Sequence, residues 1–219
     1  NEVESIIIDD DQRIYLSTYE QGIFYTPPLY DIKDFSLHEL SQTDRKTVLC
    51  SIKDGEGNIW FGPKDGMLVF YSPQKKEVQK YNVTDTPINV LFTDSKKNFW
   101  IGTENGLFLY DCNKKEKKEV KLNQAVNCVF DIDEDNEGNL WIATSLGLLK
   151  LNYTNNKQHI QHFPTDKHTY TAQTVLTAKD GTVYVGYQNG LGIVPHGNTT
   201  VKQVFTTMDG LGSNWINYL

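Results

Sequence analysis

One short pattern recurs five times along the chain, at intervals of 40 to 45 residues. Each copy has an aromatic residue, a small residue two positions later, and a glycine followed by a large apolar residue shortly after that. The aromatic residues are Tyr15, Trp60, Trp100, Trp141 and Tyr184. An aspartate stands six positions before the first four of them, and Ala178 takes its place before the fifth. A repeat of about 40 to 50 residues that is rich in short strands predicts the blades of a β-propeller.

The third copy shows how each repeat is expected to fold. Residues 99–103 and 107–110 are apolar and β-prone, and Glu104, Asn105 and Gly106 between them suit the positive φ angles of a tight hairpin. Trp100 and Gly102 point to one face of the strand at residues 99–103, and its other face is apolar as well. A strand without hydrophobic and polar alternation is buried on both sides, as in a sheet between two similar sheets. The fold class is therefore all-β, a β-propeller of four-stranded antiparallel blades.

The repeat divides the chain into about five blades within a single β-propeller segment over residues 1–219. The blades are expected at residues 1–40, 45–82, 86–122, 125–163 and 169–206, and residues 214–219 are expected to start a sixth. Both ends would then supply the same innermost strand, which predicts an incomplete ring. Because an open ring exposes flat apolar sheet faces, we expect further propeller blades or another copy of the chain to cover them.

Composition excludes several classes of partner. The 219 residues carry a net charge of −7 with a pI near 5.2, which disfavours binding to nucleic acid or to anionic lipid. No apolar run approaches the ~18 residues of a membrane span, so no direct membrane insertion is expected. Cys50, Cys112 and Cys128 have neither disulfide-framework nor zinc spacing, and we interpret them as small apolar residues.

Motifs that carry chemistry are missing from the sequence. It has no nucleophile elbow, phosphate loop or zinc signature. Asp131, Asp133 and Asp135 alternate as in a calcium loop, but Gly138 comes too late and Ile142 occupies the place of the closing glutamate. We therefore expect no catalytic residue, no metal and no cofactor, and interpret the segment as non-enzymatic.

Several of the repeated motifs carry a family resemblance. Residues 57–60, residues 100–103 with Gly106, and residues 138–141 with Gly147 resemble the two-component regulator propeller repeat. Residues 209–214 are similar to the linker between blades in that family. The resemblance implies a periplasmic sensor region of a bacterial hybrid two-component system, ahead of a membrane helix and a cytoplasmic histidine kinase. It further implies signal transduction in response to an oligosaccharide.

Candidate ligand-binding residues come from the loops, because the repeated aromatic residues are expected in the core. In a propeller, the turns between second and third strands and the links between blades open on one face, which we name the loop face. Aromatic and amide groups there suit sugar hydroxyls, although surface loops are polar in any case. The candidates are Tyr19, Arg45, Lys64, Asn89, Glu104, Asn105, Asn127, His168, Tyr170 and Tyr187.

Two other functions compete with a ligand sensor. The first is a propeller lyase of the streptogramin-lyase type, whose repeats share the Gly-Asn-Leu-Trp motif and which needs His and Glu groups converging near the channel. Only His168 is suitably placed for that role in the sequence. The second is a protein-interaction or assembly module, which would associate without any effect of sugars.

Overall fold

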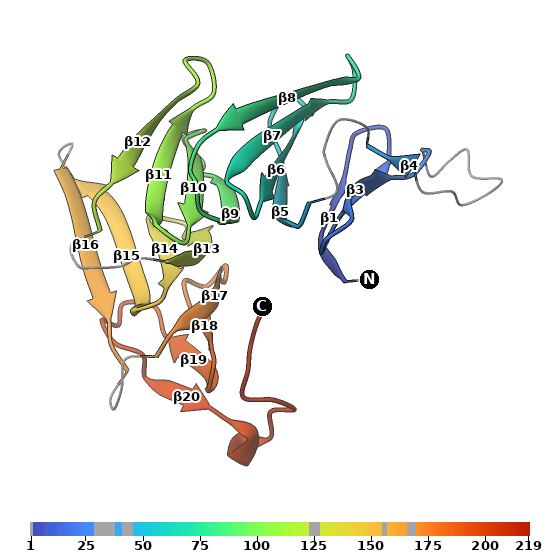
Figure 1. The fold of residues 1–219 in the computed structure, drawn as a ribbon. Coiled ribbons are helices and arrows are strands. Elements are labelled where there is room, and N and C mark those ends of the chain that lie inside the picture. Colours follow the sequence, from blue (N-terminus) through green and yellow to red (C-terminus); the bar gives the residue numbers. More distant parts are fainter. Residues whose placement is uncertain (1, 29–37, 41–45, 123–127, 155–156, 166–169) are drawn as a thin grey trace.

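The computed structural model describes residues 2–28, 38–40, 46–122, 128–154, 157–165 and 170–219. Within these residues the chain forms five four-stranded sheets, and every pair of neighbouring strands is antiparallel (Figure 1). The prediction of an all-β fold with four-stranded antiparallel blades is confirmed. The only helix among the described residues is the short 3-10 helix η2 (Thr207–Asp209), so none of their helices could cross a membrane.

Each blade consists of four strands that are consecutive in the chain and neighbours in the sheet. Blade one has β1 (Val3–Ile8), β2 (Ile14–Thr18), β3 (Gly22–Tyr25) and β4 (His38–Glu39). Blade two has β5 (Val48–Lys53), β6 (Ile59–Pro63), β7 (Met67–Ser72) and β8 (Glu77–Asn82). Blade three has β9 (Ile88–Thr93), β10 (Phe99–Thr103), β11 (Gly106–Asp111) and β12 (Glu116–Val120).

The last two blades follow the same plan. Blade four has β13 (Val129–Glu134), β14 (Leu140–Thr144), β15 (Gly147–Thr154) and β16 (Lys157–Phe163). Blade five has β17 (Ala172–Thr177), β18 (Val183–Tyr187), β19 (Gly190–Val194) and β20 (Gln203–Phe205). Its fourth strand pairs over three residues, whereas β16 of blade four pairs over seven. Blade five is therefore narrower at its outer edge than blade four.

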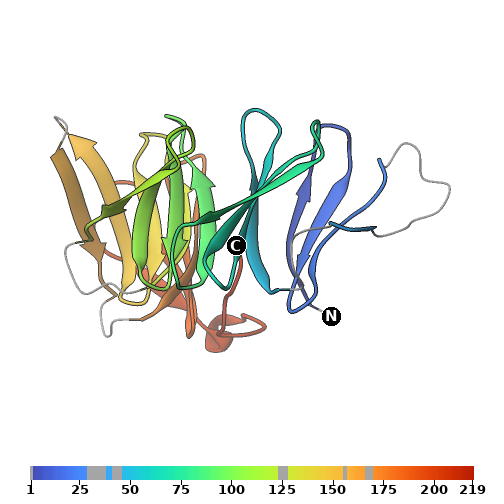
Figure 2. The same cartoon turned by 45° about the horizontal axis from the view of Figure 1, so that its top comes forward.

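The blades stand side by side in an open arc. The innermost strands contact each other in the order β1, β5, β9, β13 and β17. Figure 1 shows blades one and five at the two ends of the arc, with the C-terminal tail running back toward the middle. Figure 2 shows the turns gathered along two opposite edges of the arc. The blades therefore form an incomplete ring.

The core consists of four apolar clusters, one at each junction between neighbouring blades. The second strands β6, β10 and β14 are buried at all five of their positions. Trp100 packs toward blade four, whereas its neighbour Ile101 packs toward blade two. The absence of hydrophobic alternation in these strands thus reflects burial on both faces.

A hydrogen bond explains why the aspartate and the aromatic residue recur six positions apart. The indole N–H groups of Trp60, Trp100 and Trp141 each donate to the aspartate of their own repeat at 2.9 Å. In blade one the Tyr15 hydroxyl donates to Asp9 at 3.1 Å. The same carboxylates also accept backbone N–H groups of the turn between the first two strands. Each aspartate therefore accepts a hydrogen bond from the buried aromatic residue of its repeat and also closes the turn between the first two strands.

The small residue after the aromatic lets neighbouring blades approach. A Cβ atom added at Gly102 would lie 2.5 Å from Val90 within blade three and 2.6 Å from Val129 of blade four. At Gly62 the neighbour from the next blade is Ile88, 2.6 Å away. These distances are too short for a methyl group unless the valine or isoleucine moves.

We expect Gly102→Ala to lower the free energy of unfolding by about 1–3 kcal/mol, because the added methyl overpacks the junction between blades three and four. Gly55→Ala is the control, since no atom lies within 4 Å of its added Cβ. Urea unfolding monitored by circular dichroism measures both variants. Equal stability of Gly102→Ala and the unchanged chain would contradict a close approach of these blades.

The C-terminal tail does not form a strand in the structure. An innermost strand needs a second strand to pair with, and residues 214–219 lack such a neighbour. Even so, the Ile216 N–H donates to the Tyr187 carbonyl at 3.1 Å, and Ile216 lies against Gly186. Ile88 and Val129 occupy this place against Gly62 and Gly102. That residues 214–219 start a further blade stays a prediction.

Candidate functional site

The loop face is built by contacts between turns and links. In blades two, three and four the first residue of the turn after the second strand donates its N–H to a carbonyl of the link beside it, as Lys64 does to Thr47 at 2.9 Å and Glu104 to Pro87 at 3.1 Å. The Ser145 N–H donates to the Cys128 carbonyl in the same way. The turns between second and third strands and the links between blades therefore lie on one face. We name the opposite edge, with the turns that follow the first and third strands, the hairpin face.

The junction of blades one and two carries two of the sequence candidates. Tyr19 is 41% exposed, and the Lys64 ammonium lies 5.9 Å from the centre of its ring. Beside them, Lys46 forms an ion pair with Asp65 at 2.6 Å. A shallow hollow of about 320 Å³ opens between these turns. This part of the loop face offers an aromatic ring next to a cation, both accessible from solvent.

The candidates of blade three have different environments. Glu104 and Asn105 are exposed in the turn between β10 and β11. The Asn89 side chain instead donates to the Val129 carbonyl at 3.0 Å, so it joins blades three and four. Burial, together with the charge of Glu104, raises the pKa of the Cys128 thiol to about 11. Asn89 is therefore a structural link, and only the turn residues are available to a ligand.

Tyr170 and Tyr187 lie together on blade five, with ring centres 5.9 Å apart. Tyr187 is 1% exposed, its hydroxyl has no hydrogen-bond partner among the described residues, and burial raises the pKa of its phenol well above the usual value. A hollow of about 310 Å³ lies next to them, lined by Tyr170 and Asn189 among others. Tyr187 therefore lies in the core, whereas Tyr170 reaches the loop face.

Three candidates, Arg45, Asn127 and His168, lie outside the described residues. The structure places the other seven on three separate junctions or blades. The loop face therefore offers several small polar hollows, and the role of these residues in binding stays a prediction.

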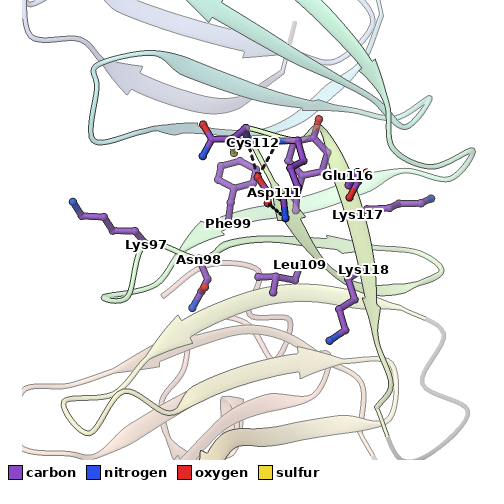
Figure 3. Close-up of a pocket in the computed structure, with 12 residues that line it drawn as sticks. Lys97, Asn98, Phe99, Leu109, Asp111, Cys112, Glu116, Lys117 and Lys118 are labelled. Atoms are coloured by element: carbon purple, nitrogen blue, oxygen red, sulfur yellow. Dashed lines mark hydrogen bonds and ion pairs between the residues drawn. The ribbon is translucent and has the colours of Figure 1, made fainter. Parts of the chain in front are cut away.

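Another hollow, of about 450 Å³, lies on the hairpin face of blade three (Figure 3). Asp111 accepts the backbone N–H groups of Asn113 and Lys114 at 3.0 Å, and these bonds lower the pKa of its carboxyl. Figure 3 shows Lys97, Lys117 and Lys118 spread around the rim with their ammonium groups apart. Since an anion site needs donors that converge on one point, this hollow does not form one.

The alternating aspartates of blade four accept hydrogen bonds from residues of blade five. Asp131 accepts Thr174 Oγ1 at 2.7 Å and the Val175 N–H at 3.0 Å, and Asp133 accepts both the N–H and the hydroxyl of Thr177. These four bonds join blade four to blade five. Within the described ranges, no group of three His, Cys, Asp or Glu residues is arranged to hold a metal.

Burial raises the pKa of the Asp131 carboxyl, because its hydrogen bonds only partly offset the loss of water. The folded chain then holds this proton more tightly than the unfolded chain. The contribution of Asp131 to stability is therefore full below the unfolded pKa of ~3.9 and is lost as pH rises through the folded pKa.

We expect Asp131→Asn to remove this pH dependence. Relative to the variant, the unchanged chain should lose stability as pH rises from about 3.5 to 7. Urea unfolding across that range measures the difference in slope, which is independent of any constant loss from an altered hydrogen bond. Parallel curves for the two proteins would show that Asp131 has an ordinary pKa.

The described histidines do not form an acid-base cluster at the channel. His38 lies on β4, His159 and His162 lie on β16, and His196 follows β19. All four therefore lie on a fourth strand or just after a third strand, and none lies on the innermost strands that face the channel. Among the described residues, nothing therefore matches the His and Glu pair that a propeller lyase would need.

The family follows from a match over most of the chain. Residues 32–162 match the family described as CFAP43 N-terminal domain, which is more than half of the 219 residues. The chain belongs to the CFAP43 N-terminal domain family. This family description names no ligand or activity.

The chain is also similar to a histidine kinase and to extracellular domains of hybrid two-component systems. The chain is 27% identical to histidine kinase P4 of Formosa agariphila over 240 residues, which covers 78% of the chain and 17% of that kinase. It is also similar to the extracellular domain of a hybrid two-component system from B. thetaiotaomicron, with a TM-score of 0.80, 19% identity, and coverage of 100% of the chain and 30% of that structure. A second such domain from the same organism has a TM-score of 0.73 and 25% identity, with coverage of 98% and 29%.

Virginiamycin B lyase from Staphylococcus aureus is another solved structure with a similar fold. Its TM-score is 0.75 at 13% identity, with coverage of 96% of the chain and 71% of the lyase. At this identity the likeness shows the fold alone. The chain spans less than a third of the length of this kinase and of the two extracellular domains.

Proposed function

We propose that this chain is a ligand-recognition segment in the extracytoplasmic sensor region of a two-component signalling receptor. The observation that carries the proposal is its similarity, at 25% identity over 98% of the chain, to the extracellular domain of a hybrid two-component system. The match to a histidine kinase over 78% of the chain supports the same class of protein. In such a receptor the segment itself is non-enzymatic, and the kinase lies elsewhere in the protein.

The finer part of the proposal is that the segment consists of two-component regulator propeller repeats, lies in the periplasm and responds to an oligosaccharide. The Asp-to-Trp bonds of three repeats and the Gly at the turn before the third strand support the repeat type. The loop face supports the ligand class, because its described residues present Tyr19, Tyr170 and Asn105 and include no convergent cluster of cations. The net charge of −7 also disfavours phosphate-rich ligands.

A thermal-shift screen on the 219-residue chain tests the ligand class. A ligand at 100 times its Kd should add roughly 2.7 kcal/mol to the stability of the folded state. For a chain of this size, this corresponds to a rise in Tm of roughly 5–11 °C. We expect a rise with at least one oligosaccharide and none with ATP, GTP or single-stranded DNA. Stabilisation by nucleotides alone would reject the oligosaccharide proposal.

The sensor role has its own test. We expect the gene product that contains this chain to incorporate phosphate on a histidine, and the matching oligosaccharide to change the rate of incorporation in membrane vesicles. A parent protein without a kinase domain would overturn the proposal. An unchanged rate, despite binding of the oligosaccharide to the segment, would reduce the segment to a binding module.

A further inference from the structure

A cleft of about 470 Å³ lies between blades four and five on the hairpin face, opposite the loop face. The two blades are joined at their innermost strands by the bonds of Asp131 and Asp133, and at the hairpin turns by Asn136, which donates to the Lys179 carbonyl at 2.9 Å. Farther out, β20 is too short to cover the sheet formed by β15 and β16. The outer part of the blade-four face is therefore left open, and the opening has the size of a small-molecule site.

Lys150 breaks the repeat pattern at this cleft. It pairs with Trp141 across the sheet, and the residues at the same place in the other blades are all apolar or aromatic. They are Tyr25, Phe70, Leu109 and Ile193. The Lys150 side chain is only 20% exposed, with its ammonium 3.1 Å from Asp135 and 4.9 Å from the centre of the Trp141 ring. A half-buried cation at a position that normally packs apolar side chains calls for a specific use.

The ammonium keeps hydrogen-bond capacity for a ligand. Lys has three N–H donors, and the Asp135 oxygen that faces Lys150 also accepts the Trp141 indole. Together with bonds from Asn139, these donors lower the pKa of Asp135 even though burial opposes its ionisation. Asp135 therefore stays charged and holds Lys150 at the wall of the cleft.

Asn152 supplies the complementary acceptor. It stands two residues after Lys150 on β15, so both side chains project from the same face of the strand. Asn152 lines the cleft, and its Oδ1 atom is buried and has no hydrogen-bond partner within the described part of the chain. A buried acceptor without a partner is unfavourable, and a ligand hydroxyl would satisfy it.

The remaining lining defines the class of ligand. Trp141 and Phe163, with ring centres 4.6 Å apart, form an apolar floor with Val183 and Val194. Two lysines line the cleft against three carboxylates, and His196 stands on the far wall beside Asp180. The charged groups are Lys150, Lys179, Asp135, Glu137 and Asp180. Without excess positive charge, the cleft suits an uncharged molecule rather than a phosphate or sulfate.

We propose that the cleft between blades four and five binds one residue of a neutral glycan, with Lys150 donating to one hydroxyl and Asn152 accepting from another. The ligand class rests on the function proposed above, whereas the site rests on the geometry of the cleft. A ligand held there contacts two blades, so its binding would also resist movement between them.

The indole signals of the 219-residue chain in ¹⁵N NMR spectra provide the test. Its four tryptophans give separate signals, and Trp60 and Trp100 have the same aspartate bond as Trp141 without a lysine beside it. We expect 10 mM maltotriose, cellotriose, mannotriose or xylotriose to shift the Trp141 signal in a saturable way and to leave those of Trp60 and Trp100 in place. Absence of any shift at Trp141 across this panel would overturn the proposal.

Variants at the cleft separate the site from the rest of the surface. Lys150→Leu introduces the residue of blade three, and Asn152→Ser introduces that of blade two, where Ser72 stands at the same place. Each variant should raise at least tenfold the trisaccharide concentration that gives half of the maximal Trp141 shift, and neither should lower Tm. Lys118→Leu on the outer strand of blade three is the control and should keep the response. An unchanged response in both cleft variants would contradict the assignment.

Failure of this site and failure of the sensor role can be told apart. If a trisaccharide stabilises the chain while Trp141 stays silent and Lys150→Leu has no effect, the cleft is wrong and the loop face remains the binding surface. If Trp141 responds but the kinase does not, the cleft binds the glycan and the signalling role fails.

Discussion

Trp100→Ala and Trp141→Ala are each expected to lower the free energy of unfolding by ~3–5 kcal/mol. Trp100 is 2% exposed and Trp141 is 4% exposed, and each ring packs into the cluster between its own blade and the next. Removal leaves a cavity between two sheets that cannot collapse, because the innermost strands hold the blades apart. It also leaves the aspartate six positions earlier without its indole donor. Urea unfolding followed by far-UV circular dichroism measures both losses.

Trp215→Ala is the matched control, because that ring is 56% exposed. It removes the same side chain and should change stability by less than about 0.5 kcal/mol. Losses below 1 kcal/mol for both buried tryptophans would mean that the rings are not part of the blade junctions. In the same experiment, Asp94→Asn should lower the free energy of unfolding by less than Trp100→Ala does, because the Asn side chain still offers the indole an oxygen acceptor.

The repeat alone was sufficient to predict the fold, because its spacing and its chemistry agree. An aromatic residue, a small residue and a glycine at fixed offsets determine a strand, a close approach and a turn in each blade. The sequence shows that the aspartate recurs six positions before the aromatic residue in four repeats, but not which groups it binds. Its bond to the indole could not be inferred from spacing, since it depends on how the turn folds back over the second strand.

The site residues were harder to predict, and Tyr187 shows why. It was interpreted as part of a surface turn, yet it shares one face of β18 with Val183 and Val185 and is buried with them against blade four. Counting two residues at a time from the strand start would have placed it in the core. Lys150 was missed for another reason. Its position opposite Trp141 follows from the register of β14 and β15, which the sequence does not specify.

The outer face of blade one is unlike the four internal junctions between blades. In blades two to five, the residues directly before and after the repeated aromatic point to the opposite face of the second strand. The preceding blade covers them almost fully, and each is 5% exposed or less. They are Ile59, Phe61, Phe99, Ile101, Leu140, Ile142, Val183 and Val185. In blade one the same positions, Ile14 and Leu16, are only half-buried. Beside them on β1, Ile6 is 63% exposed and Ile8 is 48% exposed.

We therefore expect the 219-residue chain to associate with a second copy through this face of blade one at micromolar concentration. Contiguous apolar surface of this kind is rarely left in water by a monomeric protein, and Ile6, Ile8, Ile14 and Leu16 form it on two paired strands. Ile6→Lys with Ile8→Lys should convert the associated form to a monomer, because two ammonium groups would have to be buried. Glu77→Lys with Glu119→Lys on exposed outer strands is the control and should leave association intact. Size-exclusion chromatography with light scattering measures both, and a monomeric unchanged chain at 100 μM would show that the face needs no partner.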